Sequence, residues 1–443
     1  MERLRIIGGV AAGMSAAAKA RRVNPQLDIK VFTENSYISY SSCGLPYYIG
    51  DIIKNHDSLI ARTVEDFARQ GTQVITGSRA VKIDSRQKQI LLEDLSSSRT
   101  WTEEYDRLII ATGARPVRPS LAGAELKGIF TLRNIQDSQA IKAYLKEYRP
   151  RHAVVVGAGY IGLEMVENLL AYGCQLRVIE KAPQILTNMD PDLAEIVHSY
   201  MEKQGISVLT DSTLTGFQGR DKVNEVTVGS HTFPADIVIL SMGVLPNSEI
   251  AAQTGIELGT GRAIRVNGRM ETNQPGIYAA GDCATVWHLI SEQEVYFPMG
   301  TTANKQGRVA GENAAGGNAT FKGILGTGIS RIIDMEVSRT GLSEQECKNL
   351  GIAHISRTIK SRTRVPYYPD AGSIWVKLTV EPDSRQLLGG QIVGFSGAGK
   401  RIDTIAAALA SRCKIDDLYN LDLAYSPPFS PLWDPVLTAI NRF

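Results

Sequence analysis

The sequence has few cysteines, and none of them has a partner nearby. Its 443 residues include five: Cys43, Cys174, Cys283, Cys347 and Cys413. Because the cysteine that follows Cys43 is Cys174, the chain has no local dithiol pair of the kind that closes a disulfide. An odd number of scattered cysteines is typical of a reducing compartment, so we expect a cytoplasmic protein. If Cys43 does redox chemistry, its sulfur or oxygen partner must come from outside the chain.

Long apolar runs and strong net charge are also absent. No apolar segment approaches the roughly 20 residues of a membrane span, and the N-terminus has no signal-peptide pattern. A net charge of +2 favours neither a nucleic-acid nor a membrane partner. The six histidines form no cluster and the cysteines lack metal-ligand spacing, so we expect no metal site. The length predicts about two to four domains.

Glycine, in contrast, is abundant, at 41 residues, and it marks a nucleotide loop in the middle of the chain. Residues 157–162 form a complete G-x-G-x-x-G motif between an expected strand (153–156) and an expected helix (164–172). Glu180 follows about 20 residues later, where a ribose acceptor belongs. Such glycines let the backbone approach a pyrophosphate, whose charge the helix N-terminus stabilises. The pattern predicts a dinucleotide site rather than a purely structural turn.

The residues around this acceptor bear on the choice of nucleotide. A carboxylate at Glu180 repels a 2′-phosphate and therefore favours NAD over NADP. Arg177 and Lys181 lie beside it in the sequence and weaken that preference. We therefore expect NADH, with NADPH as the alternative.

A related loop occurs at the N-terminus. Residues 8–13 follow an expected strand (4–7) and precede an Ala-rich expected helix (14–22), but Val10 occupies the position of the second glycine. Glu34 ends the next expected strand, as Glu180 does in the later copy. The chain thus contains an internal repeat of a βαβ unit. Two dinucleotide folds indicate two cofactors, one of which could be a flavin.

Three further segments end expected strands in small residues: 108–114, 237–243 and 276–282. In the last of them, Asp282 could accept a hydrogen bond from a flavin ribityl hydroxyl. The alternative role of Asp282 is a helix N-cap.

After about residue 325 the phosphate loops stop. Residues 374–378 alternate as in an antiparallel sheet, and residues 403–412 are typical of a helix. The predicted fold class is α/β, with two Rossmann-like dinucleotide-binding domains and an α+β C-terminal dimerisation domain.

Cys43 lies in the segment Ser39–Tyr48, with Pro46 at the expected first turn of a short helix. A lone cysteine is commonly a small buried apolar residue. A helix N-terminus lowers the pKa of a thiol and increases its nucleophilicity. The second interpretation makes Cys43 a reactive thiolate beside a flavin.

Taken together, these motifs resemble the pyridine nucleotide-disulfide oxidoreductase family over essentially the whole chain. The resemblance is strongest to its single-cysteine branch, which contains coenzyme A-disulfide reductases, persulfide and polysulfide reductases, NADH oxidases and NADH peroxidases. It implies an FAD domain (1–115 and 250–325), an NAD(P)H domain (116–249) and a dimerisation domain (326–443). Cys43 would be the redox sulfur in a cytoplasmic homodimer whose subunits share their active sites.

The resemblance also implies the residues that bind each cofactor. For FAD they are Gly8, Val10, Ala11, Ala12, Gly13, Glu34, Ala111, Thr112, Gly113, Gly281 and Asp282. For NAD(P)H they are Gly157, Gly159, Tyr160, Ile161, Gly162, Glu180 and Gly243. For coenzyme A, as substrate or bound thiol, they are Ser15, Lys19, Arg22, Ser39, Ser42 and Asn304, with Ser42 replacing a more usual Asn. Lys19 and Arg22 could pair with its phosphates.

Three departures from the family pattern indicate which branch of the family the chain resembles. Tyr47, Tyr48 and Ile49 occupy the stretch where dithiol enzymes carry a second cysteine. The last histidine is His354, so the C-terminal His-Glu pair of those enzymes is missing. Ala11 occupies the position of the catalytic histidine found in peroxidases, which disfavours peroxide reduction.

Two tyrosines match positions that coenzyme A-disulfide reductases place near the sulfur of the partner subunit. They are Tyr425 and Tyr367, with Tyr368 as the alternative to Tyr367. A phenol can protonate a leaving thiolate, whereas the alternative role of these rings is interface packing.

The expected function is FAD-dependent NAD(P)H reduction of a coenzyme A disulfide, persulfide or polysulfide through Cys43. Alternatives are an NADH oxidase or peroxidase on the same scaffold, and a flavin-bound redox sensor.

Overall fold

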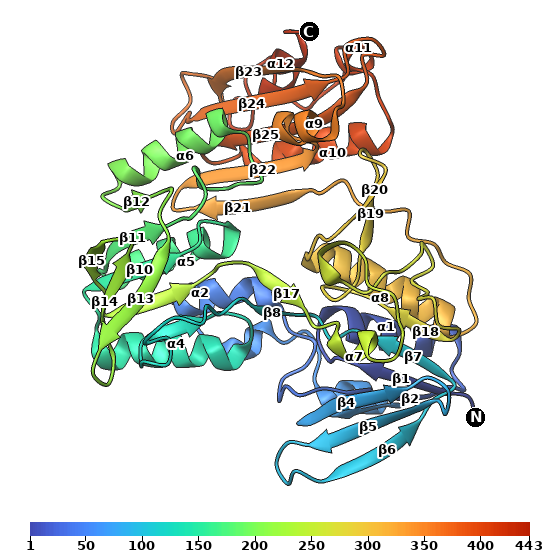
Figure 1. Cartoon of the computed structure of the whole chain (residues 1–443). Helices are drawn as coiled ribbons and strands as arrows, with labels where there is room; N and C mark the ends of the chain where they lie inside the picture. Colours follow the sequence, from blue (N-terminus) through green and yellow to red (C-terminus); the bar gives the residue numbers. More distant parts are fainter.

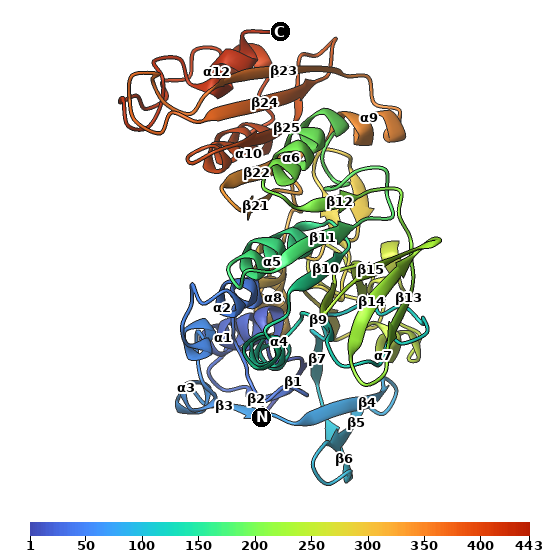
Figure 2. The same ribbon diagram turned by 90° about the vertical axis from the view of Figure 1, so that its left-hand side faces the viewer.

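The computed structural model describes residues 1–443 and contains three five-stranded sheets. The units built on these sheets form an elongated molecule, with the N-terminus at one end and the C-terminus at the other (Figures 1 and 2). No helix has both the length and the apolar character needed to cross a bilayer.

The first unit is built on a parallel sheet of order β18-β7-β1-β2-β3. Its strands are β1 (Arg3–Ile7), β2 (Asp28–Phe32), β3 (Thr72–Ile75), β7 (Arg107–Ile110) and β18 (Ile277–Ala279). Helices α1 (Ala11–Val23) and α8 (Gly300–Ala314) pack together on one face. A three-stranded antiparallel sheet packs on the other: β4 (Ser78–Asp84), β5 (Gln89–Asp94) and β6 (Thr100–Glu104).

The second unit repeats this plan with a parallel sheet of order β12-β11-β10-β16-β9. Its strands are β9 (Ile129–Thr131), β10 (His152–Val156), β11 (Gln175–Ile179), β12 (Ser207–Leu209) and β16 (Ile237–Leu240). Helices α4 (Ile135–Tyr148), α5 (Tyr160–Leu170) and α6 (Pro191–Lys203) pack into one core with the sheet. Strands β13 (Leu214–Gly219), β14 (Val223–Val228) and β15 (His231–Pro234) form the antiparallel sheet. The predicted repeat is therefore confirmed.

The third unit is an antiparallel sheet of order β21-β22-β25-β24-β23. Its strands are β21 (Gly328–Ile332), β22 (Met335–Gly341), β23 (Ile355–Arg362), β24 (Ser373–Val380) and β25 (Leu387–Gly394). Its helices are α9 (Glu344–Leu350), α10 (Ile402–Ala410), α11 (Ile415–Leu418) and α12 (Pro435–Ile440). This is the predicted α+β unit, and the fold class is confirmed.

Short elements connect the units. Strands β8 (Ala114–Pro116) and β17 (Val244–Pro246) pair where the chain leaves and re-enters the first unit. The others are α2 (Leu45–Ile49), α3 (Val64–Arg69), α7 (Glu249–Ala252), β19 (Val286–His288) and β20 (Gln293–Val295). We propose the limits 1–115 with 250–325, 116–249 and 326–443 for the three domains.

The helix that follows Cys43 belongs to the core of the second unit. Leu45 and Ile49 of α2 are fully buried among side chains of α4 and α5. Because apolar burial stabilises by about 25 cal/mol per Å², these two residues hold the Cys43 segment of the first unit against the second unit.

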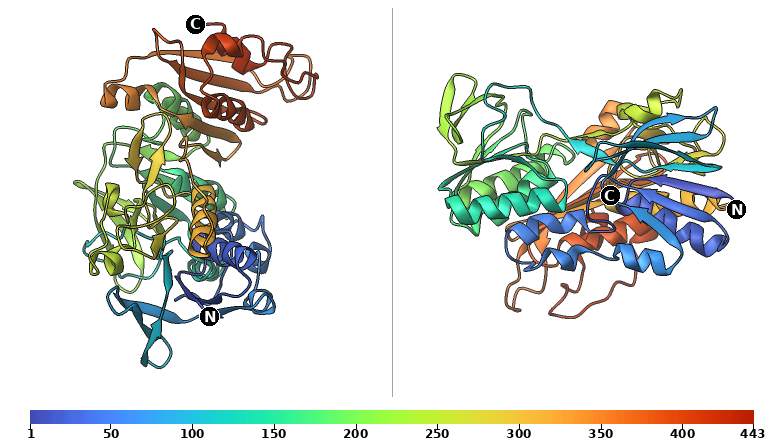
Figure 3. Two further views of the ribbon diagram at one scale, coloured as in Figure 1. Left: turned by 90° about the vertical axis from the view of Figure 1, so that its right-hand side faces the viewer. Right: turned by 90° about the horizontal axis from the view of Figure 1, so that it is seen from below.

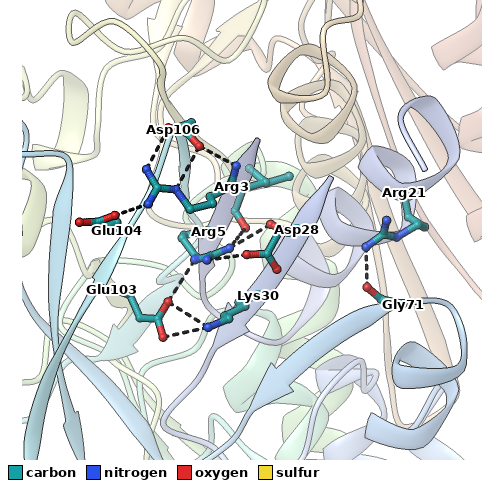
Figure 4. Close-up of polar contacts among 10 residues, drawn as sticks. Arg3, Arg5, Arg21, Asp28, Lys30, Gly71, Glu103, Glu104 and Asp106 are labelled. Atoms are coloured by element: carbon teal, nitrogen blue, oxygen red, sulfur yellow. Dashed lines mark hydrogen bonds and ion pairs between the residues drawn. The ribbon is translucent and has the colours of Figure 1, made fainter. Parts of the chain in front are cut away.

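Charged residues connect the first parallel sheet to the antiparallel sheet that packs on it (Figure 4). Arg5 is buried on β1 and donates to Asp28 Oδ2 at 2.7 Å, while Glu103 of β6 lies 3.3 Å away. Lys30 of β2 shares Glu103 at 3.0 Å. A buried guanidinium is tolerated because carboxylates pair with it, and here they fix β1, β2 and β6 to one another.

Candidate active site

The first glycine loop lies at the carboxyl ends of the parallel strands β1 and β7. Gly8 has a φ of 116°, a conformation that favours glycine. A Cβ there would lie 2.0 Å from the Ala111 carbonyl oxygen. A Cβ on Gly13 would lie 1.9 Å from the Gly8 carbonyl oxygen. Both glycines are therefore required for the turn and for the packing of α1 on the sheet.

A cleft of about 720 Å³ opens over this loop. All residues predicted to bind FAD line it except Gly13, which lies behind Gly8. Asp282 faces the cleft and accepts a hydrogen bond from the Arg133 guanidinium at 3.0 Å. No helix begins at Asp282, so it is not a helix N-cap.

The second loop has the same geometry at the carboxyl ends of β10 and β16. Gly157 has a φ of 98°, and a Cβ there would lie 2.3 Å from the Ser241 carbonyl oxygen. A Cβ on Gly162 would lie 2.1 Å from the Gly157 carbonyl oxygen. Gly159, in contrast, has no atom within 4 Å of its Cβ position. The open space lies where a phosphate would approach the N-terminus of α5.

Glu180 lies at the end of β11 and holds this loop. Its carboxylate accepts hydrogen bonds from the backbone N–H of Ala158 at 2.7 Å and of Ala182 at 2.8 Å. Gly243 has a φ of 93° and open space at its Cβ position. Ile161 is exposed, whereas the Tyr160 ring packs against Gly328 of β21.

Cys43 lies in a short 3-10 turn (Ser42–Gly44) directly before α2, and its side chain is exposed. A Cβ on Gly300, the first residue of α8, would lie 4.0 Å from its sulfur. Ser42 lines the cleft beside it. The other cysteines are buried, apart from Cys413, which is partly buried in the third unit. Cys43 is thus the thiol that adjoins the cleft.

The expectation of a lowered pKa for Cys43 is wrong. Desolvation raises the pKa of the thiol, and the charges of Glu164 and Asp282 raise it further, against smaller lowering effects of Ser42 and Arg133. The sequence argument counted only the local helix, whereas distant segments bring both carboxylates to the sulfur. The two carboxylates therefore oppose ionisation of the Cys43 thiol.

Glu164, which the sequence analysis did not single out, lies on α5 between β21 and the Cys43 sulfur. It accepts a hydrogen bond from Ser330 Oγ of β21 at 3.0 Å. Desolvation, with a contribution from Glu167, raises its pKa to about 7. Its place in the helix after the second loop, two residues past Gly162, could have marked it.

Two side chains of the second unit donate hydrogen bonds to carbonyl oxygens at the carboxyl end of α2. The Lys142 ammonium donates to the Tyr48 carbonyl oxygen at 2.7 Å, pairs with Asp51 at 2.9 Å and lies 3.9 Å from the Tyr48 ring centroid. The Tyr172 hydroxyl donates to the Ile49 carbonyl oxygen at 2.9 Å. A cation at a helix C-terminus is stabilising, so these contacts hold the redox segment in place.

The residues predicted to contact coenzyme A lie along α1 and α8. Asn304 Nδ2 donates to Ser15 Oγ at 2.8 Å, and Lys19 pairs with Glu312 at 2.8 Å. Arg22 donates only to the Ala18 carbonyl oxygen of its own helix. Ser39 has a φ of 48°, and its N–H donates to the Gly9 carbonyl oxygen.

Tyr367 and Tyr425 lie side by side on an exposed surface of the third unit, 75% and 45% exposed. The neighbouring Tyr367 phenol raises the pKa of Tyr425. Tyr368 instead lies under the Arg364 guanidinium.

Two repeated dinucleotide folds, a cleft and one accessible thiol define a two-nucleotide oxidoreductase. The model of the pyridine nucleotide-disulphide oxidoreductase family matches residues 2–307, and that of its dimerisation domain matches residues 330–435. The chain belongs to this family and is an enzyme.

Several relatives match over nearly the full length. The NAD(P)H sulfur oxidoreductase (CoA-dependent) of Pyrococcus abyssi is 36% identical over 99% of this chain and 98% of its own. The coenzyme A disulfide reductase of Staphylococcus epidermidis is 30% identical over 97% of both chains. The structure of reduced Bacillus anthracis CoADR-RHD superposes with a TM-score of 0.96 at 36% identity, covering 99% of this chain and 79% of that one.

The family uses FAD and NAD(P)H, and both loops fit these groups. The cleft over Gly8 is lined by residues at the carboxyl ends of β1, β2, β7 and β18, and by Asp282. The second loop leaves open space above Gly159. The matched dimerisation domain indicates a homodimer.

Proposed function

We propose that this enzyme reduces a coenzyme A disulfide, a coenzyme A persulfide or a polysulfide with NAD(P)H through Cys43 alone. The exposure of Cys43 beside the cleft carries the proposal, because the remaining cysteines are buried or partly buried. Relatives named for coenzyme A disulfide and for coenzyme A-dependent sulfur reduction support it.

The chemistry balances with one protein sulfur. Deprotonated Cys43 attacks one sulfur of the disulfide, so that a Cys43–S–S–CoA bond forms, the substrate S–S bond breaks, and one coenzyme A leaves and takes a proton. Two electrons from NAD(P)H then break the mixed disulfide, which returns Cys43 and releases the second coenzyme A thiol after protonation. When bound, FAD supplies the two-electron link between NAD(P)H and this disulfide.

The protein groups around the sulfur control its proton. Ser42 and Arg133 favour the thiolate, whereas Glu164 and Asp282 oppose it. The leaving coenzyme A needs a proton donor, and Tyr425 with Tyr367 has the required phenol groups. Because both phenols are exposed on the dimerisation domain, we assign them to the Cys43 site of the partner subunit.

The nucleotide and substrate contacts complete the proposal. Glu180 favours NADH, because its carboxylate ends β11 where a 2′-phosphate would lie. Ser15, Lys19, Arg22, Ser39, Ser42 and Asn304 would contact coenzyme A.

An NADH oxidase is the second candidate, since a relative named NADH oxidase from Methanocaldococcus jannaschii is 38% identical over 98% of this chain. Oxygen uptake that exceeds disulfide reduction under air would favour it. Ala11, which lines the cleft without a titratable group, weighs against peroxide reduction.

Turnover of coenzyme A disulfide with NADH tests the proposal. The wild type should consume NADH, and Cys43→Ser should lose activity by at least about a hundredfold, because no other exposed thiol lies beside the cleft. Cys413→Ser serves as the matched control and should retain activity. Wild-type turnover by Cys43→Ser would refute the mechanism.

A further inference from the structure

Helices α1 and α8 pack side by side (Figure 3). A Cβ on Gly307 would lie 2.2 Å from the Ala12 carbonyl oxygen, and one on Gly311 would lie 2.2 Å from the Ala16 carbonyl oxygen. The contact between the helices is thus backbone to backbone. Beside this contact, side chains that are not buried form a strip along the two helices. The strip consists of Ser15 and Lys19 of α1 and of Asn304, Arg308 and Glu312 of α8.

The strip can be assigned from helical spacing and two cross-links. Residues four apart on a helix share one face, so Asn304, Arg308 and Glu312 lie in one row on α8. Asn304 bonds to Ser15 of α1 at 2.8 Å, and Glu312 pairs with Lys19 of α1 at 2.8 Å. These cross-links fix the row against α1 and place Arg308 between them.

Like the neighbouring exposed Lys305 of α8, Arg308 has no partner in the chain. It forms no ion pair and no side-chain hydrogen bond in the chain, and it is exposed. Lys19, in contrast, is paired with Glu312. Arg21 donates to the Pro25 carbonyl oxygen and to the Gly71 carbonyl oxygen (Figure 4). A guanidinium with free donors is suited to bind phosphate in a bidentate manner.

The strip begins at the reactive sulfur. Gly300, beside Cys43, is the first residue of α8, and Arg308 lies eight residues further along, about 12 Å at 1.5 Å per residue. A substrate with its sulfur at Cys43 and an extended arm along α8 would carry its distal charges to Arg308 and Lys19.

We infer that Arg308 is a second phosphate anchor on the α8 side and that Glu312 is a counter-charge from which Lys19 must part when phosphate binds. The ligand class is a thiol or disulfide whose arm ends in phosphates, as in coenzyme A, so the inference rests on the proposed function. Arg308 would determine specificity for phosphate-bearing substrates over simple disulfides.

Kinetics with two disulfides test the inference. Pantethine has the same arm and sulfurs as coenzyme A disulfide but no phosphates. Arg308→Gln should raise the KM for coenzyme A disulfide about tenfold and leave the KM for pantethine unchanged. Glu312→Gln should lower the KM for coenzyme A disulfide by about threefold, because it frees Lys19. Arg220→Gln, which removes an exposed unpaired arginine of the β13–β14 hairpin, is the matched control.

Calorimetric binding of adenosine 3′,5′-bisphosphate separates this inference from the proposed function, because it needs no turnover. Arg308→Gln should weaken binding about tenfold at unchanged melting temperature. No binding by the wild type, or equal binding by Arg308→Gln, would overturn the inference. If the nucleotide binds through Arg308 but coenzyme A disulfide is not reduced, the anchor stands and the proposed function fails.

Discussion

In both glycine loops, the glycines at the first and third positions allow a close approach of backbone atoms. The two loops differ at the second position. A Cβ on Gly8 or Gly157 would meet the carbonyl oxygen of a neighbouring strand end at 2.0 or 2.3 Å. A Cβ on Gly13 or Gly162 would meet the carbonyl oxygen of that first glycine at 1.9 or 2.1 Å. These positions are required by the packing of strand, loop and helix, whatever the loop binds.

The second position is free of that requirement. Val10 occupies it in the first loop with a φ of −112°, and Gly159 occupies it in the second with a φ of −81° and nothing within 4 Å of a Cβ. Both backbones lie on the side of φ that any residue adopts. The middle glycine therefore reflects the bound nucleotide rather than the fold.

The helices after the loops differ in a second way that concerns chemistry. Two residues past the third glycine, α1 has Ser15 and α5 has Glu164. Ser15 binds Asn304 of α8, whereas Glu164 binds Ser330 of β21 and acts on the Cys43 thiol. Equivalent positions of the repeat thus differ: Ser15 links α1 to α8, whereas the charge of Glu164 raises the pKa of Cys43.

The largest effect should follow substitution at a first-position glycine. Gly8→Val introduces a side chain at positive φ and against the Ala111 carbonyl oxygen, so it should cost more than about 3 kcal/mol of the free energy of unfolding. Thermal unfolding and the flavin-to-protein absorbance ratio would measure it. Val10→Ala is the control, and equal losses in both variants would contradict the comparison.

Glu164→Gln should show the titration of this carboxyl. Its folded pKa of about 7 lies above the ordinary 4.5, so the stability it contributes is present below pH 4.5 and lost as pH rises through 7. The variant should be more stable than the wild type by about 2 kcal/mol at pH 8.5 and equal to it near pH 4. Urea unfolding at both pH values measures this, with Ser15→Ala as a pH-independent control. Alkylation of Cys43 should also shift to lower pH in Glu164→Gln; an unshifted profile would count against their coupling.

Gly159→Val should separate binding from folding. Its backbone accepts valine, so the melting temperature should hold, while the KM for NADH should rise at least about tenfold as the methyl groups fill the open space. Val10→Gly should leave the KM for NADH unchanged. Steady-state kinetics decide this, and a Gly159→Val variant with the wild-type KM would show that the second loop does not hold the nucleotide.

The smallest effects on the free energy of unfolding should follow substitution of Glu180 and Glu34, the acidic residues that end the two βαβ units. Glu180→Ala removes an acceptor of two backbone N–H groups and should cost about 1 kcal/mol. Glu34→Ala removes only an exposed pair with Arg79 and should cost less than about 0.5 kcal/mol. Denaturant unfolding of both variants tests the order, which the reverse ranking would contradict.

Local sequence patterns predicted more of the fold than of the candidate site. Glycine spacing and alternating apolar residues predict both βαβ units, because each unit forms from neighbouring residues. The contacts of Lys142 with Tyr48 and of Glu164 with Ser330 join residues 94 and 166 positions apart, and no local pattern reports such pairs. The expected pKa of Cys43 was wrong for this reason.

Intact mass of the oxidised enzyme tests the central claim, which is that the partner of the Cys43 sulfur comes from outside the chain. After incubation with coenzyme A disulfide without NADH, each subunit should gain the mass of one coenzyme A thiol, mapped to Cys43. NADH should release that mass. An adduct on another cysteine, or full turnover with no adduct on Cys43, would contradict the account.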